Sequence, residues 1–499
     1  MSVEEEYPYG WEAYAREDLE YFSRKCFPGE KTSEEFHKTW FKIAEDDSIR
    51  RAVNIAPRNS GKTTCWAKKA PLWMLGRNPN LKILLLGRAA EKAIANMRFI
   101  RVNVENNKLV QAVFPDLKPF GRGAPWGEEY LTVENTRLDG EVSVLARGLE
   151  GQIAGFRADR IFCDDLIDKT NVMTEGQRVK VKEFWNEIVF PTLNPDGRVF
   201  IIGSRYHNKD FYSDILRDPA YKEHVYSFPA FKMDEKGNLL LDKDGKPISY
   251  WPSRWTVDKL LDFKNEIGSI AFASQFLCDP SGFEGRLFNP DWIQYYDPYK
   301  VLSSKLQELE YIMAVDPNIK EDPKSDNTAI ITIAVDRRYK EIYVLDYFAE
   351  PLDFIGQVKK IKELGSRLTI PYIPIEAHIR KIGVESTAYQ KALQSTGYLM
   401  GLPVVEVQHS KSDKVTRILR IQPHIENGRI KFPDLEVVTP RWWDKFYEEY
   451  CTFPRGRRDD MMDVLEVAVE IAGVTESGST IPFGPGGGSM FRRLTVESA

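Results

Sequence analysis

The chain has 499 residues, 42% of them hydrophobic and 29% charged, with a formal net charge of −5. This length predicts two or three domains, and the net charge does not indicate nucleic-acid binding, although a local basic groove would be enough for it. The five cysteines contain no CxxC pair, no apolar run could span a bilayer and the start is acidic, so we expect reduced thiols, no zinc site, no signal peptide and a cytoplasmic protein.

The residue pattern of the first part of the chain changes at about residue 50. Residues 1–45 are rich in aromatic and charged residues and are expected to be helical. After them, short apolar runs alternate with amphipathic stretches, which is typical of parallel strands buried on both faces with helices between them. We therefore expect an α/β domain over 46–278. Its predicted strands are RAVNIA (51–56), KILLLG (82–87), RIFCDD (160–165) and RVFIIGS (198–204).

The second part is expected to hold another α/β domain. Residues 230–256 are polar and turn-rich, so they predict a surface hairpin or the start of a linker. Residues 279–305 carry Gly and Pro without periodicity and are interpreted as the interdomain linker. The domain expected over 306–475 contains 328–348, two strand-like runs joined by a charged turn, which predict an antiparallel pair. The Gly/Ser/Pro-rich tail, 476–499, is expected to be disordered.

A candidate phosphate-binding loop, APRNSGKTT, lies between an expected strand and an expected helix. The nucleotide-binding pattern is Gly, four residues, then Gly-Lys-Ser/Thr, and here Ala56 replaces the first Gly. Lys62 would reach the β and γ oxygens of the nucleotide, and the Thr63 hydroxyl would ligate Mg²⁺. The alternative is a chance GKT in a basic turn. The loop residues expected to bind nucleotide are Arg58, Ser60, Gly61, Lys62, Thr63 and Thr64.

Polar residues also follow two other expected strands. Asp164 and Asp165 end RIFCDD. Asp164 is placed to hold Mg²⁺ through water, and Asp165 would orient the attacking water, a role more often filled by Glu. Ser204 ends RVFIIGS, where a polar residue can sense the γ-phosphate. The alternatives are a helix cap or solvated turn for the acid pair and an ordinary turn at Ser204.

The second half carries a series of carboxylates at the ends of expected elements. Each alone could be a turn or cap residue. If they converge, their repulsion would require cations, which implies a pair of divalent metals ~3.5–4 Å apart, the arrangement for phosphodiester hydrolysis. Their order along the chain is that of an RNase H-like metal site. The residues are Asp316, Asp326, Glu385, Asp459, Asp460 and Asp463.

Basic residues lie near these carboxylates in the sequence and could contact DNA phosphates. A solvated turn or a plain charged helix face is the alternative for both groups. The first group is Arg455, Arg457 and Arg458, and the second is Lys411, Lys414, Arg417 and Arg420.

Taken together, these motifs resemble the large terminase subunit of tailed double-stranded DNA bacteriophages. The resemblance rests on PRNSGKTT, DD, GSRYHNKDF, and KVTRILRIQPHIENGRIKFP followed by RRDDMMDVLEVA, and it covers roughly residues 40–475. It implies a P-loop ASCE-type ATPase domain with a mainly parallel sheet, followed by an RNase H-like nuclease domain. ATP hydrolysis would move double-stranded DNA into a procapsid, and a two-metal endonuclease would cut the concatemer.

The resemblance also implies roles for individual residues. In the ATPase domain, Lys62 and Thr63 would bind ATP and Mg²⁺, Asp164 would be the Walker B acid, Asp165 the catalytic carboxylate and Ser204 part of the coupling motif. In the nuclease domain, Asp316, Glu385 and Asp460 would hold Mg²⁺ or Mn²⁺, with Asp326, Asp459 and Asp463 as neighbours. Candidates for an arginine that stabilises the transferring phosphoryl group are Arg58, Arg147 and Arg157.

The implied partners are double-stranded DNA, a small terminase subunit and the portal protein of the procapsid, in the host cytoplasm and without a membrane. A ring of copies would form on the portal, and the free protein could be a monomer. An ATP-dependent nuclease or helicase of DNA repair is the alternative, and it predicts a second RecA-like domain. A decayed ATPase in an assembly protein would have lost catalytic residues, and a small-molecule kinase leaves the second half unexplained.

Overall fold

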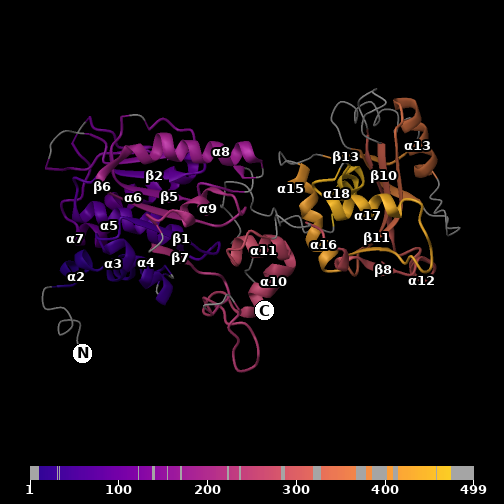
Figure 1. Ribbon diagram of the computed structural model, residues 1–499, viewed down its shortest axis with the longest axis horizontal. Helices are drawn as coiled ribbons and strands as arrows, with labels where there is room; N and C mark the ends of the chain where they lie inside the picture. The colour runs from indigo at the N-terminus through magenta and orange to yellow at the C-terminus, as the bar shows by residue number, and fades with distance from the viewer. Residues whose placement is uncertain are drawn as a thin grey trace, which may run out of the picture. The chain divides into compact units, whose positions relative to one another are not determined.

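The computed structural model divides into two compact units (Figure 1). Among the described residues, unit 1 holds 10–261 and 271–281, and unit 2 holds 262–270 and 287–473. The structure describes residues 10–473 except 31, 33, 122, 137–140, 154, 169–170, 173, 222–223, 235–237, 282–286, 318–327, 367–377, 385–401, 408–413 and 457. Across this described part of the chain, no helix is both long and apolar enough to cross a membrane.

Unit 1 is built on a seven-stranded sheet in the order β3-β4-β2-β5-β6-β1-β7, parallel except for the β3–β4 pair. The strands are β1 (Arg51–Ile55), β2 (Ile83–Gly87), β3 (Tyr130–Leu131), β4 (Val144–Gly148), β5 (Ala158–Asp164), β6 (Leu193–Gly203) and β7 (Val225–Ser227). The predicted strands are confirmed, and β6 lies between β1 and β5. Ile55 is level with Gly203, and Asp164 with Ile202, so these three strands end at the same edge.

Both faces of this sheet are covered, as the continuous apolar strands predict. On one face, Trp185 packs with Ile161 and Ile201. On the other, the Trp66 ring contacts Phe200 at 5.4 Å between centroids. The helical elements are α2 (Trp11–Glu17), α3 (Leu19–Cys26), α4 (Glu35–Glu45), η1 (Thr63–Lys69), α5 (Ala70–Arg77), α6 (Ala90–Asn106), α7 (Lys108–Val113), α8 (Glu175–Glu183), η3 (Phe184–Val189), η4 (Phe190–Thr192) and α9 (Phe211–Arg217). Two further helices, α10 (Val257–Ile267) and α11 (Ser269–Phe276), belong partly to unit 1 and partly to unit 2, because residues 262–270 fall in unit 2.

The helical character predicted for the N-terminal segment is found in its described residues. Helices α2, α3 and α4 belong to unit 1, and Figure 1 shows them in indigo beside α5. The turn-rich stretch 230–256 contains isolated antiparallel bridges, among them Phe231 with Ser249 and Met233 with Leu239. It therefore folds as a hairpin-like excursion of unit 1, one of the two alternatives that its sequence left open.

Unit 2 contains a second seven-stranded sheet, in the order β13-β12-β9-β10-β11-β14-β8. The strands are β8 (Gln294–Tyr296), β9 (Glu310–Asp316), β10 (Thr328–Asp336), β11 (Glu341–Glu350), β12 (Ile379–Val384), β13 (Val404–Glu406) and β14 (Ile430–Pro433). Strands β10 and β11 form the antiparallel pair that the charged turn predicted. Strand β9 is also antiparallel to β10, and β12 returns parallel to β9.

The stretch 279–305, interpreted from its sequence as a linker, supplies part of unit 2. Strand β8 pairs with β14, and Leu302 of helix α12 (Pro298–Lys305) is fully buried. The Gly and Pro residues therefore mark tight turns between short elements, which a composition-based interpretation does not distinguish from a linker. The helical elements of this unit are η7 (Pro290–Trp292), α12 (Pro298–Lys305), α13 (Phe354–Ser366), α15 (Lys414–Ile418), η8 (Leu419–Ile421), α16 (Gln422–Glu426), α17 (Trp443–Thr452) and α18 (Asp460–Ala472).

Helix α18 is the central helix of unit 2. It packs against β9, β10 and β11, and it is buried along nearly its whole length, including Asp460 and Asp463 in its first turn. Asp459 precedes the helix, but its side chain caps no backbone N–H. Instead, Glu449 of α17 accepts the Met461 N–H at 2.8 Å. Capping from another helix leaves the carboxylates at the start of α18 available for other partners.

Candidate functional site

The predicted phosphate loop lies between β1 and η1, at the edge where β1, β5 and β6 end. Its chain curls through left-handed backbone at Asn59 (φ 59) and Gly61 (φ 89). Ala56, which replaces the usual first glycine, is fully buried, and its N–H donates to the Gly203 carbonyl at 3.2 Å. A methyl group thus fits where the loop leaves the strand. The helix after the loop starts as one π-helical segment, η1, of a kind often found at functional sites.

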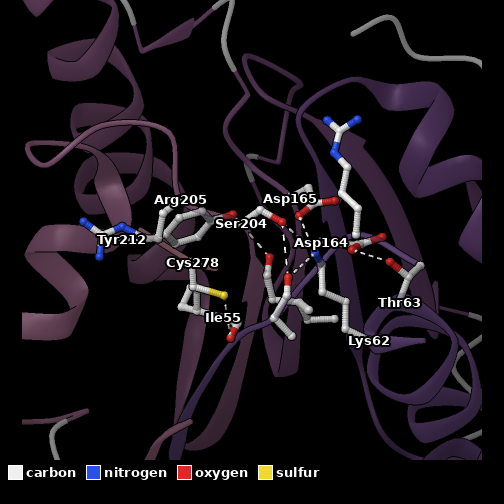
Figure 2. Close-up of polar contacts among 12 residues, drawn as sticks. Ile55, Lys62, Thr63, Asp164, Asp165, Ser204, Arg205, Tyr212 and Cys278 are labelled. Carbon is white, nitrogen blue, oxygen red and sulfur yellow. Dashed lines mark hydrogen bonds and ion pairs between the residues drawn. The ribbon is translucent and has the colours of Figure 1, made fainter. Parts of the chain in front are cut away.

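Lys62 is held at the centre of the cluster that Figure 2 shows. Its ammonium donates to the Ala56 carbonyl at 2.9 Å and to the Ser204 hydroxyl at 2.8 Å, and it lies 3.7 Å from Asp165 Oδ1. The side chain is only 5% exposed. Burial lowers its pKa, and the Asp165 charge opposes that effect. Lys62 therefore joins the loop to the ends of β5 and β6.

Asp164 is fixed by two neighbours. The Thr63 hydroxyl donates to its Oδ1 at 2.8 Å, and the Asn96 amide of α6 donates to its Oδ2 at 3.1 Å. The Asp164 side chain is fully buried. The predicted Mg²⁺-binding pair, Thr63 and Asp164, is thus already assembled.

Asp165 lies in strained backbone just after β5. Its φ of 48 is rare for a residue with a side chain, and such strain often occurs at functional sites. Burial raises its pKa, but Lys62 and Lys92 more than offset this effect, so its pKa lies below the usual range and the carboxylate is ionised. Its Oδ1 is buried and accepts no hydrogen bond from the described residues. That oxygen is therefore available to a water molecule.

Two polar residues of this site, Lys92 and Asn96, come from α6 and were not identified from the sequence. The Lys92 ammonium lies 2.5 Å from Asp165 Oδ2 and 3.6 Å from Asp164 Oδ1. Although burial alone would lower it, the pKa of Lys92 is raised by these two carboxylates. Lys92 therefore adds a second positive charge, besides that of Lys62, next to the acid pair. The only sequence signal was an amphipathic helix directly after a buried strand.

The structure separates the three candidate arginines. Arg58 is close enough to Asp165 to lower the pKa of that carboxyl group, and its guanidinium donates to the Tyr206 hydroxyl at 2.7 Å. Arg147 pairs with Glu129 at 2.8 Å, and Arg157 is exposed and donates to a backbone carbonyl. Arg58 is thus the candidate that lies beside the acid pair.

The residues of this cluster fit a nucleotide with Mg²⁺. The Ser60 hydroxyl in the loop is buried without a hydrogen-bond partner among the described residues, and Asp165 Oδ1 is in the same situation. Buried polar atoms are rarely left unpaired unless a ligand or water completes them. A phosphate would supply acceptors to Ser60 and Lys62, and a hydrated cation would suit Thr63 and the acid pair.

In unit 2, the structure places two of the predicted metal ligands on adjacent elements. Asp316 ends β9, and Asp460 begins α18, the helix that packs on this strand. Glu385 and Asp326 lie outside the described residues, but Val384 is level with Val315, so the strands that lead to Glu385 and Asp316 end together. Within the described residues, no group of three His, Cys, Asp or Glu side chains could hold a metal ion.

Two of the neighbouring carboxylates already have cationic partners. Asp463 lies 3.1 Å from both Lys414 and Arg417, and Asp459 lies 2.7 Å from Lys414. Arg417, 8% exposed, also pairs with Glu466 at 3.2 Å. Arg417 is therefore a buried structural cation, and its interpretation as a residue lining a DNA groove is wrong. The helical spacing of the basic residues in α15 could not show whether they form an exposed face or pack on the acidic helix α18.

Of the other basic residues, Arg455 and Arg458 are exposed at the start of the acidic helix, where a phosphate could reach them. Lys411 and Arg457 lie outside the described residues. The interpretation of Arg455 and Arg458 as phosphate contacts remains a prediction.

The geometry defines the class of protein. In unit 1, the phosphate loop follows β1 and the acid pair lies at the end of β5, and β6 lies between these two strands of a mainly parallel sheet. This is an ASCE-type ATPase arrangement. Residues 313–470, in unit 2, match the family described as Terminase RNaseH-like domain. The fold class predicted from the sequence is confirmed.

Three further proteins are similar to this chain. The large terminase subunit of Enterobacteria phage T3 is 26% identical over 262 residues, which are 48% of this chain and 42% of that protein. The chain thus aligns with less than half the length of this curated relative. The large terminase of the thermophilic bacteriophage D6E has 11% identity and a TM-score of 0.47, over 87% of this chain and 96% of that one. The human cytomegalovirus terminase nuclease domain has 13% identity and a TM-score of 0.28, over 37% and 95%. The resemblance to large terminase subunits that the motifs indicated is confirmed.

Proposed function

We propose that this protein is the large subunit of a viral genome-packaging motor. ATP hydrolysis in unit 1 drives double-stranded DNA into a procapsid, and a metal-dependent endonuclease in unit 2 cuts the concatemer. The observation that carries the proposal is the convergence of Lys62, Asp164, Asp165 and Ser204 at the ends of three neighbouring strands. The family match of residues 313–470 supports the nuclease half.

In unit 1, the Lys62 ammonium binds the β and γ oxygens of ATP after exchanging its present partners for phosphate. The Thr63 hydroxyl, with Asp164 acting through water, would hold Mg²⁺, which neutralises charge on the phosphates when it is bound. The ionised Asp165 accepts a hydrogen bond from the attacking water through Oδ1, which accepts no hydrogen bond from the described residues. Arg58, beside this carboxylate, contributes positive charge where the transition state gains negative charge.

Ser204 links this chemistry to movement of the protein. Its hydroxyl accepts from Lys62 and donates to the Ala56 carbonyl at 3.3 Å, so it contacts the loop at two points. If a γ-phosphate takes the Lys62 ammonium, Ser204 loses that donor, which is one of its two contacts with the loop. Arg205, the next residue, is tied to Asp210 before α9 at 3.3 Å. A shift of β6 would therefore reach α9.

In unit 2, we propose that Asp316, Asp460 and Glu385 hold Mg²⁺ or Mn²⁺, with Asp326 nearby. Asp459 and Asp463 contribute less directly, because Lys414 already pairs with both. When bound there, such cations would supply the Lewis-acid chemistry that phosphodiester hydrolysis needs.

The proposed partners are double-stranded DNA, the small terminase subunit and the portal protein, in the host cytoplasm. Copies of the chain form a ring on the portal, and the free protein is a monomer. A repair nuclease with helicase activity is not favoured, because the family match falls on an RNase H-like unit and not on a second RecA-like domain.

The function is tested with the purified protein and supercoiled plasmid in Mg²⁺ or Mn²⁺. Wild type should nick and linearise the plasmid only with a divalent metal, and Asp316→Asn should lose the activity while its ATP turnover stays within twofold of wild type. Lys300→Met, which changes an exposed residue of the same unit, serves as the control. Cleavage that survives Asp316→Asn, or no metal-dependent cleavage by wild type, would contradict the nuclease half of the proposal.

A further inference from the structure

We propose that His37, in the N-terminal helix α4, is a positioning residue that holds the phosphate loop in its binding conformation. Its Nε2 lies 2.8 Å from the carbonyl oxygen of Ser60, inside the loop. The inference rests on the proposed function, because it assumes that this loop binds nucleotide. It assigns part of the ATPase site to a segment that carries no nucleotide-binding motif.

The hydrogen-bond partners of His37 fix which nitrogen carries the proton. Its Nδ1 lies 3.3 Å from the Glu34 N–H and accepts from it, so Nε2 carries the hydrogen and donates to Ser60. The ring is fully buried between Phe36, Trp40 and Trp251. Burial lowers its pKa to about 4, so the imidazole is neutral and keeps this tautomer at physiological pH.

The same ring fills the space beneath the most constrained residue of the loop. A Cβ atom at Gly61 would lie 2.9 Å from His37 Nε2 and 3.6 Å from the Thr32 methyl group. Gly61 also has a φ of 89, which side chains rarely adopt. His37 therefore contacts the backbone immediately before Lys62 both by hydrogen bonding and by packing. Its ring prevents the loop from moving toward α4.

Further buried contacts hold the N-terminal helices against the helix that follows the loop. The Lys69 ammonium, fully buried in η1, pairs with Glu30 at 2.6 Å and donates to Ser23 and Thr32 at 2.8 and 3.0 Å. The Trp66 indole donates to the Trp40 carbonyl at 2.7 Å. The Trp66 bond connects η1 to α4, and the Lys69 contacts connect η1 to α3 and to the segment before α4, so His37 is carried on a rigid support. A positioning group needs such support to act on its target.

The test distinguishes the effect of the His37–Ser60 hydrogen bond on the loop from the effect of packing among the N-terminal helices. His37→Leu keeps the volume and removes the donor, whereas His37→Gln offers an amide N–H that can reach the Ser60 carbonyl. Trp73→Phe is the matched control, because the Trp73 indole donates to the Ala15 carbonyl at 2.9 Å in the same helical layer, away from the loop. The affinity for Mg²⁺·ADP, the KM and kcat for ATP and the midpoint of thermal unfolding are measured for each.

We expect His37→Leu to bind Mg²⁺·ADP about tenfold more weakly, which corresponds to the loss of one buried hydrogen bond. Its KM for ATP should rise by a similar factor, and His37→Gln should restore both values to within about threefold of wild type. Trp73→Phe should lower the unfolding midpoint without changing affinity. If His37→Leu does not fold, His37→Asn, whose shorter amide cannot reach Ser60, takes its place.

Equal affinity in wild type and His37→Leu would overturn the inference, as would an equal loss of affinity in Trp73→Phe. Failure of His37→Gln to restore binding in a folded protein would do the same. Failure of the proposed function looks different, because then wild type itself would bind no nucleotide at this loop.

Discussion

Replacing Lys92 by Met should make the nucleotide-free protein less stable and its Mg²⁺·ADP complex relatively more stable. Lys92 lies 2.5 Å from Asp165 and 3.6 Å from Asp164. Removing one member of a fully buried ion pair costs about 3–5 kcal/mol. Here Lys92 is 33% exposed and Asp165 29% exposed, and Lys62 stays in place, so we expect about 2 kcal/mol. For a unit of this size, that lowers the unfolding midpoint by roughly 5 °C.

The second half of this prediction follows from competition for the same carboxylates. In wild type, the Lys92 ammonium lies 3.6 Å from Asp164 Oδ1, the same oxygen that accepts the Thr63 hydroxyl, so a cation held by Thr63 and Asp164 would compete with it. Without the ammonium, Mg²⁺·ADP should bind more tightly and raise the midpoint by more degrees than in wild type.

The assay is thermal unfolding with no ligand, with ADP and EDTA, and with ADP and Mg²⁺. Lys92→Arg, which keeps the charge, is the control and should behave like wild type. An unchanged midpoint in the nucleotide-free Met variant would refute the reasoning, and so would a smaller gain from Mg²⁺·ADP than wild type shows.

Three further outcomes are expected. Asp165→Asn should retain Mg²⁺·ADP binding but lose about 10²-fold or more in ATP turnover, and turnover near wild type in a steady-state phosphate assay would exclude it as the water-orienting group. His37 has a pKa of about 4 in the folded protein, which is below its ordinary value. Between these two pKa values the unfolded chain binds more protons than the folded one, so the free energy of unfolding should fall by up to about 3 kcal/mol as the pH drops from about 6.5 to 4. Denaturant titrations of His37→Gln should show a shallower pH dependence, and an identical slope would contradict the assignment. Arg417→Met should destabilise unit 2 by about 3 kcal/mol, because it leaves Asp463 and Glu466 underpaired, whereas Arg420→Met should cost less than about 1 kcal/mol; equal midpoints in denaturant would count against the buried network.

The sequence predicted the parts of the fold that depend on local pattern. The apolar runs gave the parallel strands of unit 1, and the polar residues at their tips, Lys62, Asp164 and Ser204, meet because parallel strands end at one edge. The antiparallel pair in 328–348 was predicted by its turn. The linker predicted at 279–305 was wrong for β8 and α12, because short elements joined by tight turns have the composition of a linker.

The remaining parts of the site depend on contacts between distant segments. Lys92 and Asn96 lie on α6, a helix that carries no sequence motif. They reach the acid pair only because α6 packs on the sheet. His37 acts on the loop from 23 positions away. Asp463 was a plausible metal neighbour until its cationic partners on α15 were seen. Glu385 and Asp326 lie outside the described residues, so their roles stay predictions.

The central claim is that the cluster around Lys62 hydrolyses ATP for work on DNA. It is tested most directly by steady-state phosphate release from ATP in Mg²⁺, with and without linear double-stranded DNA, for wild type and Lys62→Ala. We predict that DNA stimulates ATP turnover in wild type and that turnover falls to background in Lys62→Ala. Thermal unfolding should show that both proteins are folded. Undiminished turnover in Lys62→Ala would contradict the account.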